Sequence, residues 1–385
     1  MLSHFTKRAA LRIALVIVAA LVFSSPIYAQ NGATVKPGFT LLWRHPVPPL
    51  RGLDISPQGG RLALLTMDGR IAVWDVATAK PIWSQQGIKG TNVRISDGVG
   101  YVFIYDPMNP DYRDVSFYDA GSGRLVATKR SDGAIWDLSV SDSGDFMGVG
   151  TGNDSLYIYT LDVYPSYHRV PLRGVCNALA FSPDGSFVAT GLWNQSGIDC
   201  FDTTGNLLTS VPGAVTKRFE PSITRNSKFV LALQYINHQM RQPVLTLLQR
   251  NGNRVWSHGM GSNASNVHAI SSSNGDFTVA SYLKDVIRDR AWVPERSLVV
   301  LDSTGRPVFE IGGLYLALTL LCLSPDNNGF VAYDGDRTLY RFGRNGNALG
   351  VWQLNAPIRY WARTHDDTYL LVHTVDNALT LLQVQ

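Results

Sequence analysis

The sequence predicts an all-β protein, a β-propeller in which eight four-stranded sheets, here called blades, form a closed ring. Three observations support this prediction. One strand–turn–strand unit recurs at intervals from 40 residues (Ser56 to Ser96) to 52 residues (Ser272 to Ser324), the period of propeller blades. A glycine-containing hairpin turn follows this unit about 20 residues later. The last copy of the unit lacks a strand, and the N-terminal region supplies one.

The repeated unit is clearest at Ala178–Thr190, where two apolar runs flank the turn Ser-Pro-Asp-Gly. Proline presets φ in such a turn, aspartate bonds the nearby backbone, and glycine accepts a positive φ. Eight copies of the turn predict eight blades. A ring of seven is the alternative if the last and most degenerate copy is discounted. Equivalent turns begin at Ser56, Ser96, Ser141, Ser182, Thr224, Ser272, Ser324 and Thr364.

The second periodic turn joins the third and fourth strands of a blade. Glycine-containing turns between apolar runs, Asn-Gly above all, are hairpin signals. Tryptophan often stands near the middle of the fourth strand, as at Trp83, Trp256 and Trp352, and we expect these rings to pack between blades. The turns lie at Asp119–Gly123, Asp202–Asn206, Asn251–Asn253, Asp302–Gly305 and Asn345–Asn347.

The two ends of the chain are predicted to share the last blade. Phe39–His45 has the pattern of a fourth strand but precedes the first repeat, whereas the last repeat supplies only three strands, at Ile358–Arg363, Thr368–His373 and Ala378–Val384. Pairing the two ends removes open sheet edges and closes the ring. The predicted blades span residues 50–89, 90–132, 133–172, 173–213, 214–261, 262–313, 314–355, and 356–385 together with 37–47.

Residues 1–29 are predicted to be an export signal peptide, and residues 30–385 a single propeller domain. Three basic residues precede the apolar run Ile13–Phe23, and the small residue Ala29 suits cleavage at its C-terminal side. The apolar run is about half of the roughly 20 residues that a membrane span needs. We therefore expect a protein that is periplasmic or extracellular after cleavage and has no stable membrane anchor.

The net charge of the chain argues against nucleic acid as a partner. The formal net charge is +4, and removal of residues 1–29, with three basic and no acidic residues, leaves +1. Nucleic-acid binding needs Lys and Arg concentrated on one face, so we expect no binding of nucleic acid.

Cys176, Cys200 and Cys322 are predicted to be buried and unpaired. Cys176 and Cys200 fall on the first and third strands of one blade, beyond disulfide reach.

Two stretches of the chain resemble WD40-type repeats. Ile71–Asp75 (Ile-Ala-Val-Trp-Asp) stands at a third strand, and Phe181–Gly185 (Phe-Ser-Pro-Asp-Gly) at a first turn. Over the mature chain the sequence looks like that superfamily, although most blades lack the Trp-Asp pair. The Trp-bearing fourth strands are also similar to those of pyrroloquinoline-quinone-type propellers, which are commonly eight-bladed and exported. The resemblance implies the fold and says little about function.

The two faces of the predicted ring differ in their connections. Antiparallel alternation puts the turns between strands one and two, and three and four, on one face, called here the turn face. Connections between strands two and three, and between blades, lie on the other, the loop face. Turn-face connections are uniformly short, and loops on a rigid scaffold often carry binding residues. The longer connections, all predicted to be loops of the loop face, are Asp106–Asp114, Tyr164–Arg173, Ile236–Pro243 and Lys284–Arg296.

We therefore predict a non-enzymatic, monomeric propeller that binds a protein or a polymeric ligand, such as a polysaccharide, on its loop face. Aromatic and arginine side chains dominate interface energetics, so those in or beside the loops are the candidates. No cofactor is expected. The candidate binding residues are Tyr105, Tyr112, Arg113, Tyr235, His238, Arg241, Arg288, Arg290, Trp292 and Arg296.

The alternative is an exported enzyme, either a quinone-dependent dehydrogenase or a carbohydrate-active lyase or hydrolase, with its site in the mouth of the central channel. The sequence shows no histidine pair spaced for zinc and no Gly-x-Ser-x-Gly elbow, and we expect no catalytic residue and no metal site. His365, Asp366 and Asp367 are interpreted as a solvated turn rather than a catalytic dyad. Convergent polar groups at the channel mouth would favour the enzyme.

Overall fold

The computed structural model describes residues 38–97, 100–162, 165–193, 197–212, 221–235, 243–261, 264–288, 291–314 and 318–385. At 234–235, 286–288, 291–294 and 312–314 the description covers the backbone alone. The regular structure of the described residues consists of 32 β-strands. None of these residues belongs to a helix long and apolar enough to cross a bilayer.

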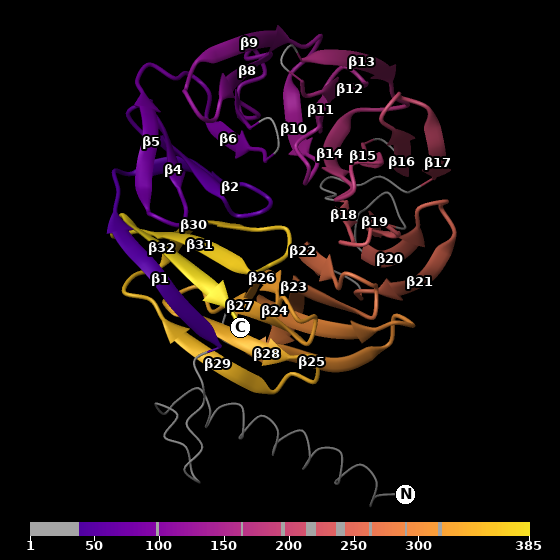
Figure 1. The fold of residues 1–385 in the computed structure, drawn as a ribbon. Coiled ribbons are helices and arrows are strands. Elements are labelled where there is room, and N and C mark those ends of the chain that lie inside the picture. The colour runs from indigo at the N-terminus through magenta and orange to yellow at the C-terminus, as the bar shows by residue number, and fades with distance from the viewer. Residues whose placement is uncertain are drawn as a thin grey trace, which may run out of the picture. The chain divides into compact units, whose positions relative to one another are not determined.

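The strands form eight four-stranded antiparallel sheets in a ring, with the first strand of each blade toward the centre (Figure 1). The eight-bladed prediction is confirmed. Blade 1 has β2 (Leu50–Ile55), β3 (Arg61–Thr66), β4 (Ile71–Asp75) and β5 (Lys80–Gln85); blade 2 has β6 (Asn92–Ile95), β7 (Tyr101–Tyr105), β8 (Asp114–Asp119) and β9 (Leu125–Arg130); blade 3 has β10 (Ile135–Val140), β11 (Phe146–Thr151), β12 (Ser155–Thr160) and β13 (Ser166–Pro171); blade 4 has β14 (Cys176–Phe181), β15 (Phe187–Leu192), β16 (Gly197–Asp202) and β17 (Leu207–Val211).

The second half of the ring repeats this order. Blade 5 has β18 (Ser222–Ile223), β19 (Phe229–Tyr235), β20 (Pro243–Gln249) and β21 (Arg254–Gly259); blade 6 has β22 (Ala264–Ser271), β23 (Phe277–Arg288), β24 (Ala291–Asp302) and β25 (Pro307–Leu314); blade 7 has β26 (Thr319–Leu323), β27 (Gly329–Tyr333), β28 (Thr338–Gly343) and β29 (Ala348–Gln353); blade 8 has β30 (Ile358–Arg363), β31 (Tyr369–Thr374), β32 (Ala378–Val384) and β1 (Phe39–Pro46).

The chain ends close the ring as the sequence predicts. Strand β1 pairs antiparallel with β32, in a register that runs from Phe39 opposite Val384 to Pro46 opposite Ala378. The order of the sheet is β1, β32, β31, β30, so the N-terminal strand is the outer strand of blade 8. Hydrogen bonds between strands distant in sequence therefore join the first and last parts of the propeller, and no open sheet edge remains at the seam.

The turns between first and second strands share one hydrogen-bond pattern. In seven of the eight, the Ser or Thr hydroxyl accepts a hydrogen bond from the backbone N–H five residues later, at 3.0 to 3.2 Å. In seven turns the fourth residue has a positive φ, and three of these residues are not glycine: Ser227, Asn327 and Asp367. Their side chains link blades: the Ser227 hydroxyl accepts the N–H of Asp184 in blade 4 (3.2 Å), the Asn327 amide donates to the Ser273 hydroxyl in blade 6 (2.6 Å), and Asp367 pairs with Arg225 of blade 5 (2.7 Å).

Aromatic residues on fourth strands pack against the next blade, which confirms the predicted role of these rings. The indole N–H of Trp83 donates to the carbonyl of Ala120 (2.9 Å), and that of Trp43 donates to the carbonyl of Val76 (2.8 Å). A Cβ added at Gly123 would lie 2.7 Å from the Trp83 ring. Glycine suits this hairpin turn for two reasons: its φ is +75°, and the neighbouring blade approaches too closely for a Cβ atom.

Two of the predicted loops are strands. Lys284–Arg296 belongs to β23 and β24, whose register extends to Arg288 opposite Ala291, so blade 6 projects a long hairpin instead of a loop. Most of Tyr164–Arg173 is β13, the outer strand of blade 3. From the sequence, both segments are interpreted as loops because they lengthen the connections between the predicted strands. Outer strands and hairpin ends tolerate charged residues and proline, because part of their surface faces water.

The cysteine prediction is confirmed. All three cysteines are buried and free, and Cys176 and Cys200 lie on the first and third strands of blade 4. Burial raises the pKa of the Cys200 thiol to about 12, so this thiol is unreactive at neutral pH.

Candidate functional site

The loop of blade 2 presents an exposed methionine. Its first residue, Asp106, is buried, and its carboxylate accepts hydrogen bonds from the Thr91 hydroxyl (2.7 Å) and from the backbone N–H of Met108 (3.0 Å). These bonds fix the start of the loop. The side chain of Met108 is 84% exposed, which is a large apolar surface in contact with water on the loop face.

The three candidates of this loop differ in exposure. Tyr105 is fully buried at the end of β7, where burial raises its pKa to about 12, so it anchors the loop in the core and does not reach a ligand. Its assignment to the exposed site is thereby corrected. Tyr112 and Arg113 are half-buried, and the Arg113 guanidinium donates to the carbonyl of Asp132 in the link to blade 3 (3.4 Å).

The remaining candidates lie on blades 5 and 6. Tyr235 ends β19, Arg288 ends β23 and Trp292 is the second residue of β24, so their backbones stand at the loop-face ends of these strands. Only the backbone is described at these three positions. Arg296 is half-buried and donates to the Thr319 hydroxyl of blade 7 (3.3 Å). Three candidates lie outside the described residues: His238, Arg241 and Arg290.

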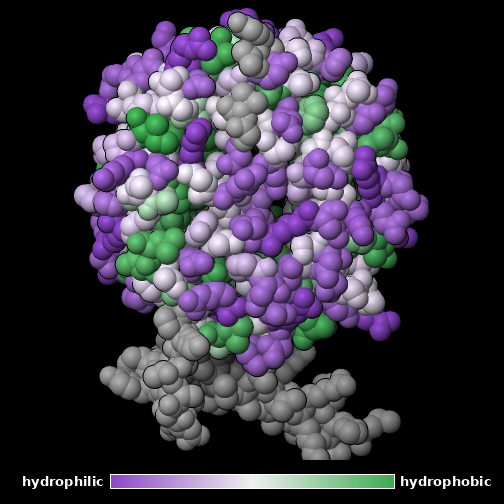
Figure 2. Space-filling view, in the orientation of Figure 1, coloured by the Kyte–Doolittle hydropathy of each residue, from purple (hydrophilic) through white to green (hydrophobic). Residues whose placement is uncertain are grey.

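Exposed large hydrophobic residues fall into two groups. Ten of the fourteen in the described residues lie on fourth strands, at least one in every blade, and form the outer rim of the ring. Figure 2 shows such residues as separate patches on a mostly hydrophilic surface. A feature present in every blade belongs to the repeat itself. The other four, which occur in particular blades, are Met67, Met108, Trp136 and Val375.

Two of these four occupy the same position in different blades. In the turn between strands two and three, the N–H of Met67 donates to the carbonyl of Pro49 (2.8 Å) and that of Val375 to the carbonyl of Pro357 (2.9 Å). Trp193 of blade 4 makes the equivalent bond with Val175 (2.8 Å). The side chains of Met67 and Val375 are 62% and 52% exposed. A tight, hydrogen-bonded backbone therefore holds apolar side chains out into water.

A tryptophan pair continues the series. Trp136, near the loop-face end of β10, is 43% exposed, and its ring lies edge-on to Trp193 with centroids 6.1 Å apart. We call Val375, Met67, Met108, Trp136 and Trp193 the apolar arc. Its members come from blades 8, 1, 2, 3 and 4, which follow one another around the ring (Figure 1). All five stand at the loop face, because four lie in connections between second and third strands and Trp136 lies near the start of β10.

Sequence reasoning identified this face but missed the arc, because it looked for Tyr, Trp and Arg in long loops. The signal was present in short turns. Met67 stands between Thr66 and Asp68, and Val375 between Thr374 and Asp376, where a polar residue is the usual choice. An apolar residue in an otherwise polar turn was the available clue.

Polar groups converge across the central channel at the turn face. Asp367 of blade 8 is 2% exposed and accepts hydrogen bonds from Arg363 of its own blade and from Arg225 of blade 5 (2.7 Å for Arg225). Arg225 also donates to the carbonyl of His365 (2.8 Å), and the His365 imidazole pairs with Asp142 of blade 3. Three blades that are not neighbours are thus joined. The predicted turn at 365–367 is present, with Asp366 exposed and His365 half-buried, but the prediction is wrong for Asp367, which is buried in this network.

The network leaves little room for a substrate. The cavity beside Arg225, Arg363 and His365 has a volume of about 40 Å³. One water molecule takes up about 30 Å³ of liquid, whereas pockets for organic ligands measure about 300 to 1,000 Å³. The convergent polar groups at this mouth of the channel are therefore bonded to one another, and the cavity beside them is too small for an organic substrate.

Comparison with known proteins agrees with the fold. No model of a known protein family matches the chain. A stretch of 166 residues is 26% identical to the WD repeat-containing protein 90 of Mus musculus, covering 39% of this chain and 8% of that protein. The chain therefore corresponds to a small part of this relative's length.

Two solved structures extend the comparison to nearly the whole chain. The structure of the Dos1 propeller aligns with a TM-score of 0.66 at 14% identity, over 92% of this chain and 97% of that one. Kuenenia stuttgartiensis hydrazine synthase aligns with a TM-score of 0.56 at 10% identity, over 93% of this chain and 100% of that one. Such identities show the fold alone.

Proposed function

Since the chain is a WD40-like β-propeller with eight blades, we propose that it is a non-enzymatic scaffold that holds a partner protein on its loop face. The observation that carries the proposal is the apolar arc. Four of its five side chains account for every strongly exposed large hydrophobic residue that lies off the outer rim in the described part of the chain. A partner that covers this face would bury all of these side chains, which makes the face a candidate interaction site.

The chemistry of the arc suits a protein partner. Burying apolar surface contributes about 25 cal/mol per Å², and methionine adapts its shape to an irregular partner surface. The backbone of the arc is already ordered by the bonds of Met67, Trp193 and Val375. Binding therefore does not have to order these turns, and less conformational entropy is lost on association.

Polar candidates from the sequence stand at the edge of the arc. Tyr112 and Arg113 share the loop of Met108, and both retain partial exposure. An apolar centre with a polar rim is the usual arrangement of a protein interface. We assign these two residues to the rim of the site, where they add specificity more than affinity.

We further propose that the protein works outside the cytoplasm, which rests on the pattern of residues 1–29. Expression of the full chain in a bacterium, followed by fractionation and intact-mass measurement, tests this. The expected product is an envelope or secreted protein whose mass matches a chain that begins at Gln30. A cytoplasmic product that retains residues 1–29 contradicts the export proposal and leaves the binding proposal standing.

The binding proposal is tested by comparing two triple variants of the purified protein. Met67→Ser, Met108→Ser and Val375→Ser remove apolar surface from the arc. Leu125→Ser, Leu207→Ser and Val308→Ser remove similarly exposed residues from the outer rim and serve as the matched control. Both variants and the parent protein are used to capture partners from the host's extracytoplasmic fraction, and the affinity for the captured protein is then measured.

We expect the arc variant to lose affinity by at least about tenfold, because central apolar anchors carry most of the binding free energy. The control variant, with its three changes on the outer rim of the ring, should bind like the parent. Equal binding by the arc variant, or equal loss in both variants, contradicts the assignment. Capture of a polysaccharide in place of a protein would show that the ligand class is wrong while the face is right.

A further inference from the structure

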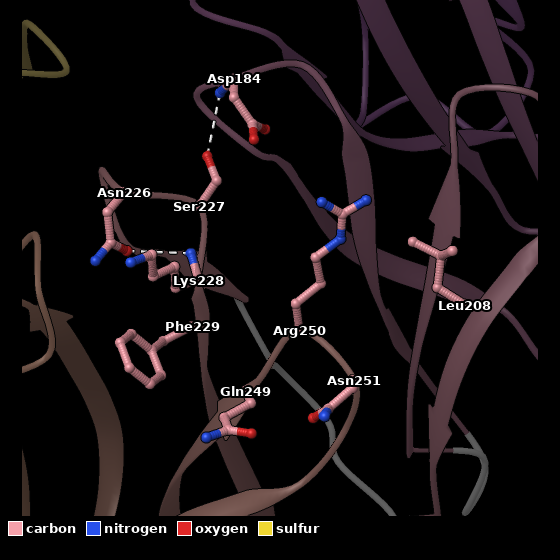
Figure 3. A pocket seen from close by; sticks show the side chains of 9 residues that line it. All are labelled: Asp184, Leu208, Asn226, Ser227, Lys228, Phe229, Gln249, Arg250 and Asn251. Atoms are coloured by element: carbon pink, nitrogen blue, oxygen red, sulfur yellow. Dashed lines mark hydrogen bonds between the residues drawn. The ribbon is translucent and has the colours of Figure 1, made fainter.

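A groove lies between blades 4 and 5 on the turn face, opposite the apolar arc (Figure 3). Its walls are the first turns of both blades, at Asp184 and Lys228, and the third-to-fourth-strand turn of blade 5, at Gln249 and Arg250. Leu208 on β17 forms the outer edge. The volume is about 580 Å³, within the range of ligand sites.

Two cations of the groove have no acidic partner among the described residues. The ammonium group of Lys228 is exposed and makes no hydrogen bond or ion pair with the part of the chain that the structure describes. The guanidinium of Arg250 lies over the Phe187 ring, 5.0 Å from its centroid, and one of its nitrogens donates to the Ser186 hydroxyl (3.1 Å). This packing holds the guanidinium in place, and its other N–H groups remain available toward the groove.

The interface between blades 6 and 7 shows how an arginine at the same position is neutralised. Arg344 occupies the position of Arg250 and lies over Phe277 as Arg250 lies over Phe187, 4.5 Å from the centroid. There the residue before the phenylalanine is Asp276, whose carboxylate pairs with Arg344 at 3.6 Å. In blade 4 the same position holds Ser186. A serine in place of an aspartate leaves Arg250 without its internal anion.

From this comparison we propose that the groove between blades 4 and 5 binds the carboxylate of an acidic side chain in a peptide segment of another protein. The ligand carboxylate takes the place that Asp276 fills at the other interface. A planar guanidinium offers two parallel N–H donors, which match the two oxygens of a carboxylate. Lys228 adds a second charge, and the apolar edge at Leu208 and Phe229 contacts the peptide around the acid.

The charge of the groove favours a monoanion. Asp184 stays ionised, because hydrogen bonds from the Ser186 and Ser182 hydroxyls lower its pKa despite the opposing effect of burial. Two cations and this one anion leave a net charge of +1. A carboxylate neutralises that charge. A phosphate dianion would leave the groove with a net negative charge and would be repelled by Asp184.

The test uses a capped peptide, Ala-Leu-Glu-Leu-Ala, and the same peptide with Gln in place of Glu. Calorimetric titration measures binding to the full protein and to three variants. Ser186→Asp supplies the internal anion that blade 6 has, Lys228→Gln removes the second charge, and Arg344→Gln is the matched control at the other interface. Inorganic phosphate is titrated as a competitor, and thermal melting checks that each variant folds.

We expect the Glu peptide to bind the parent protein and the Arg344→Gln variant alike. Affinity should fall at least about tenfold with the Gln peptide and with Ser186→Asp, since a charge-assisted hydrogen bond is lost. The Lys228 ammonium makes no hydrogen bond or ion pair with the described residues, so Lys228→Gln, which should also weaken binding of the Glu peptide, keeps the test valid if Ser186→Asp fails to fold. The proposal is overturned by no binding of the Glu peptide, by equal binding of both peptides, by tight binding of Ser186→Asp, or by tighter binding of phosphate.

Discussion

The two faces of this ring solve different problems with the same repeat. On the turn face, hydrogen bonds and ion pairs join blades 3, 5 and 8 across the channel, through Arg225, His365, Asp367 and Asp142. On the loop face, tight turns hold Met67 and Val375 out into water. On the turn face, blade-specific polar residues hold the ring together. On the loop face, blade-specific apolar side chains remain exposed to water.

Departures from the repeat distinguish structure from function in this protein. The turn hydroxyls and the apolar outer rim occur in nearly every blade, so they belong to the scaffold. Asp367 and Ser186 differ from the residues at the same positions of the other blades, and exposed Met67 shares its position with Val375. Of these, Asp367 is buried and bonded, whereas Met67 is exposed, and Ser186 gives Arg250 a hydroxyl in place of an anion. A residue that departs from the repeat and leaves an apolar surface exposed or a charge uncompensated is therefore the better functional candidate.

The largest effect on stability should come from the turn-face network. Asp367→Ala leaves Arg225 and Arg363 without their carboxylate, and an uncompensated buried charge costs about 3 to 5 kcal/mol of unfolding free energy. Urea denaturation of the variant and the parent measures this. A loss below about 1 kcal/mol would mean that the network does not hold the ring, and the contrast between the faces would fail.

The second effect depends on pH. His373 on β31 is fully buried, and neither ring nitrogen has a partner among the described residues. Burial, reinforced by Arg359, lowers its pKa to about 4. The unfolded state then binds more protons between pH 6.5 and 4, so stability is complete above pH 6.5 and is lost as the pH falls, by on the order of 3 kcal/mol.

Replacement of His373 identifies this contribution. His373→Leu removes the titrating group at similar volume, so the unfolding free energy of the variant should depend less on pH between 6.5 and 4 than that of the parent. Denaturant titrations at several pH values supply the comparison. Parallel curves for the two proteins would assign the acid sensitivity to other groups.

A smaller effect is expected from a turn that every blade shares. Ser182→Ala removes the hydroxyl that accepts the N–H of Phe187 at 3.0 Å and should cost about 1 kcal/mol. Ser56→Ala provides the matched measurement in blade 1, where the bond to Arg61 is 3.2 Å. Similar losses in the two variants would support a repeat-wide role, and a loss confined to one blade would refute it.

The smallest effect on stability should come from the arc. The triple change of Met67, Met108 and Val375 to serine alters side chains that are already exposed, so the unfolding free energy should change by less than about 0.5 kcal/mol per site. The same urea experiment measures it. A large loss of stability would show that the arc packs internally and would remove the reason to assign it to a partner.

The fold was predictable because its signals are local. A turn such as Ser182 to Gly185 bonds its own backbone, and its recurrence counts the blades without knowledge of their contacts. The pairing of β1 with β32 also followed, because one repeat lacked a strand that the N-terminal segment matched. The hairpin of β23 and β24 did not follow, since charge and Pro294 are compatible with either a loop or a protruding hairpin.

The sequence by itself determined the blade count, the closure of the ring and the assignment of connections to two faces, because each depends on strand order and on turns within a few residues. Only the tertiary structure decided which residues meet. Asp142, Arg225 and His365 are distant in sequence and come together because the ring brings their turns to one channel mouth. Exposure of Met67 and burial of Tyr105 likewise depend on neighbouring blades, which no local pattern records.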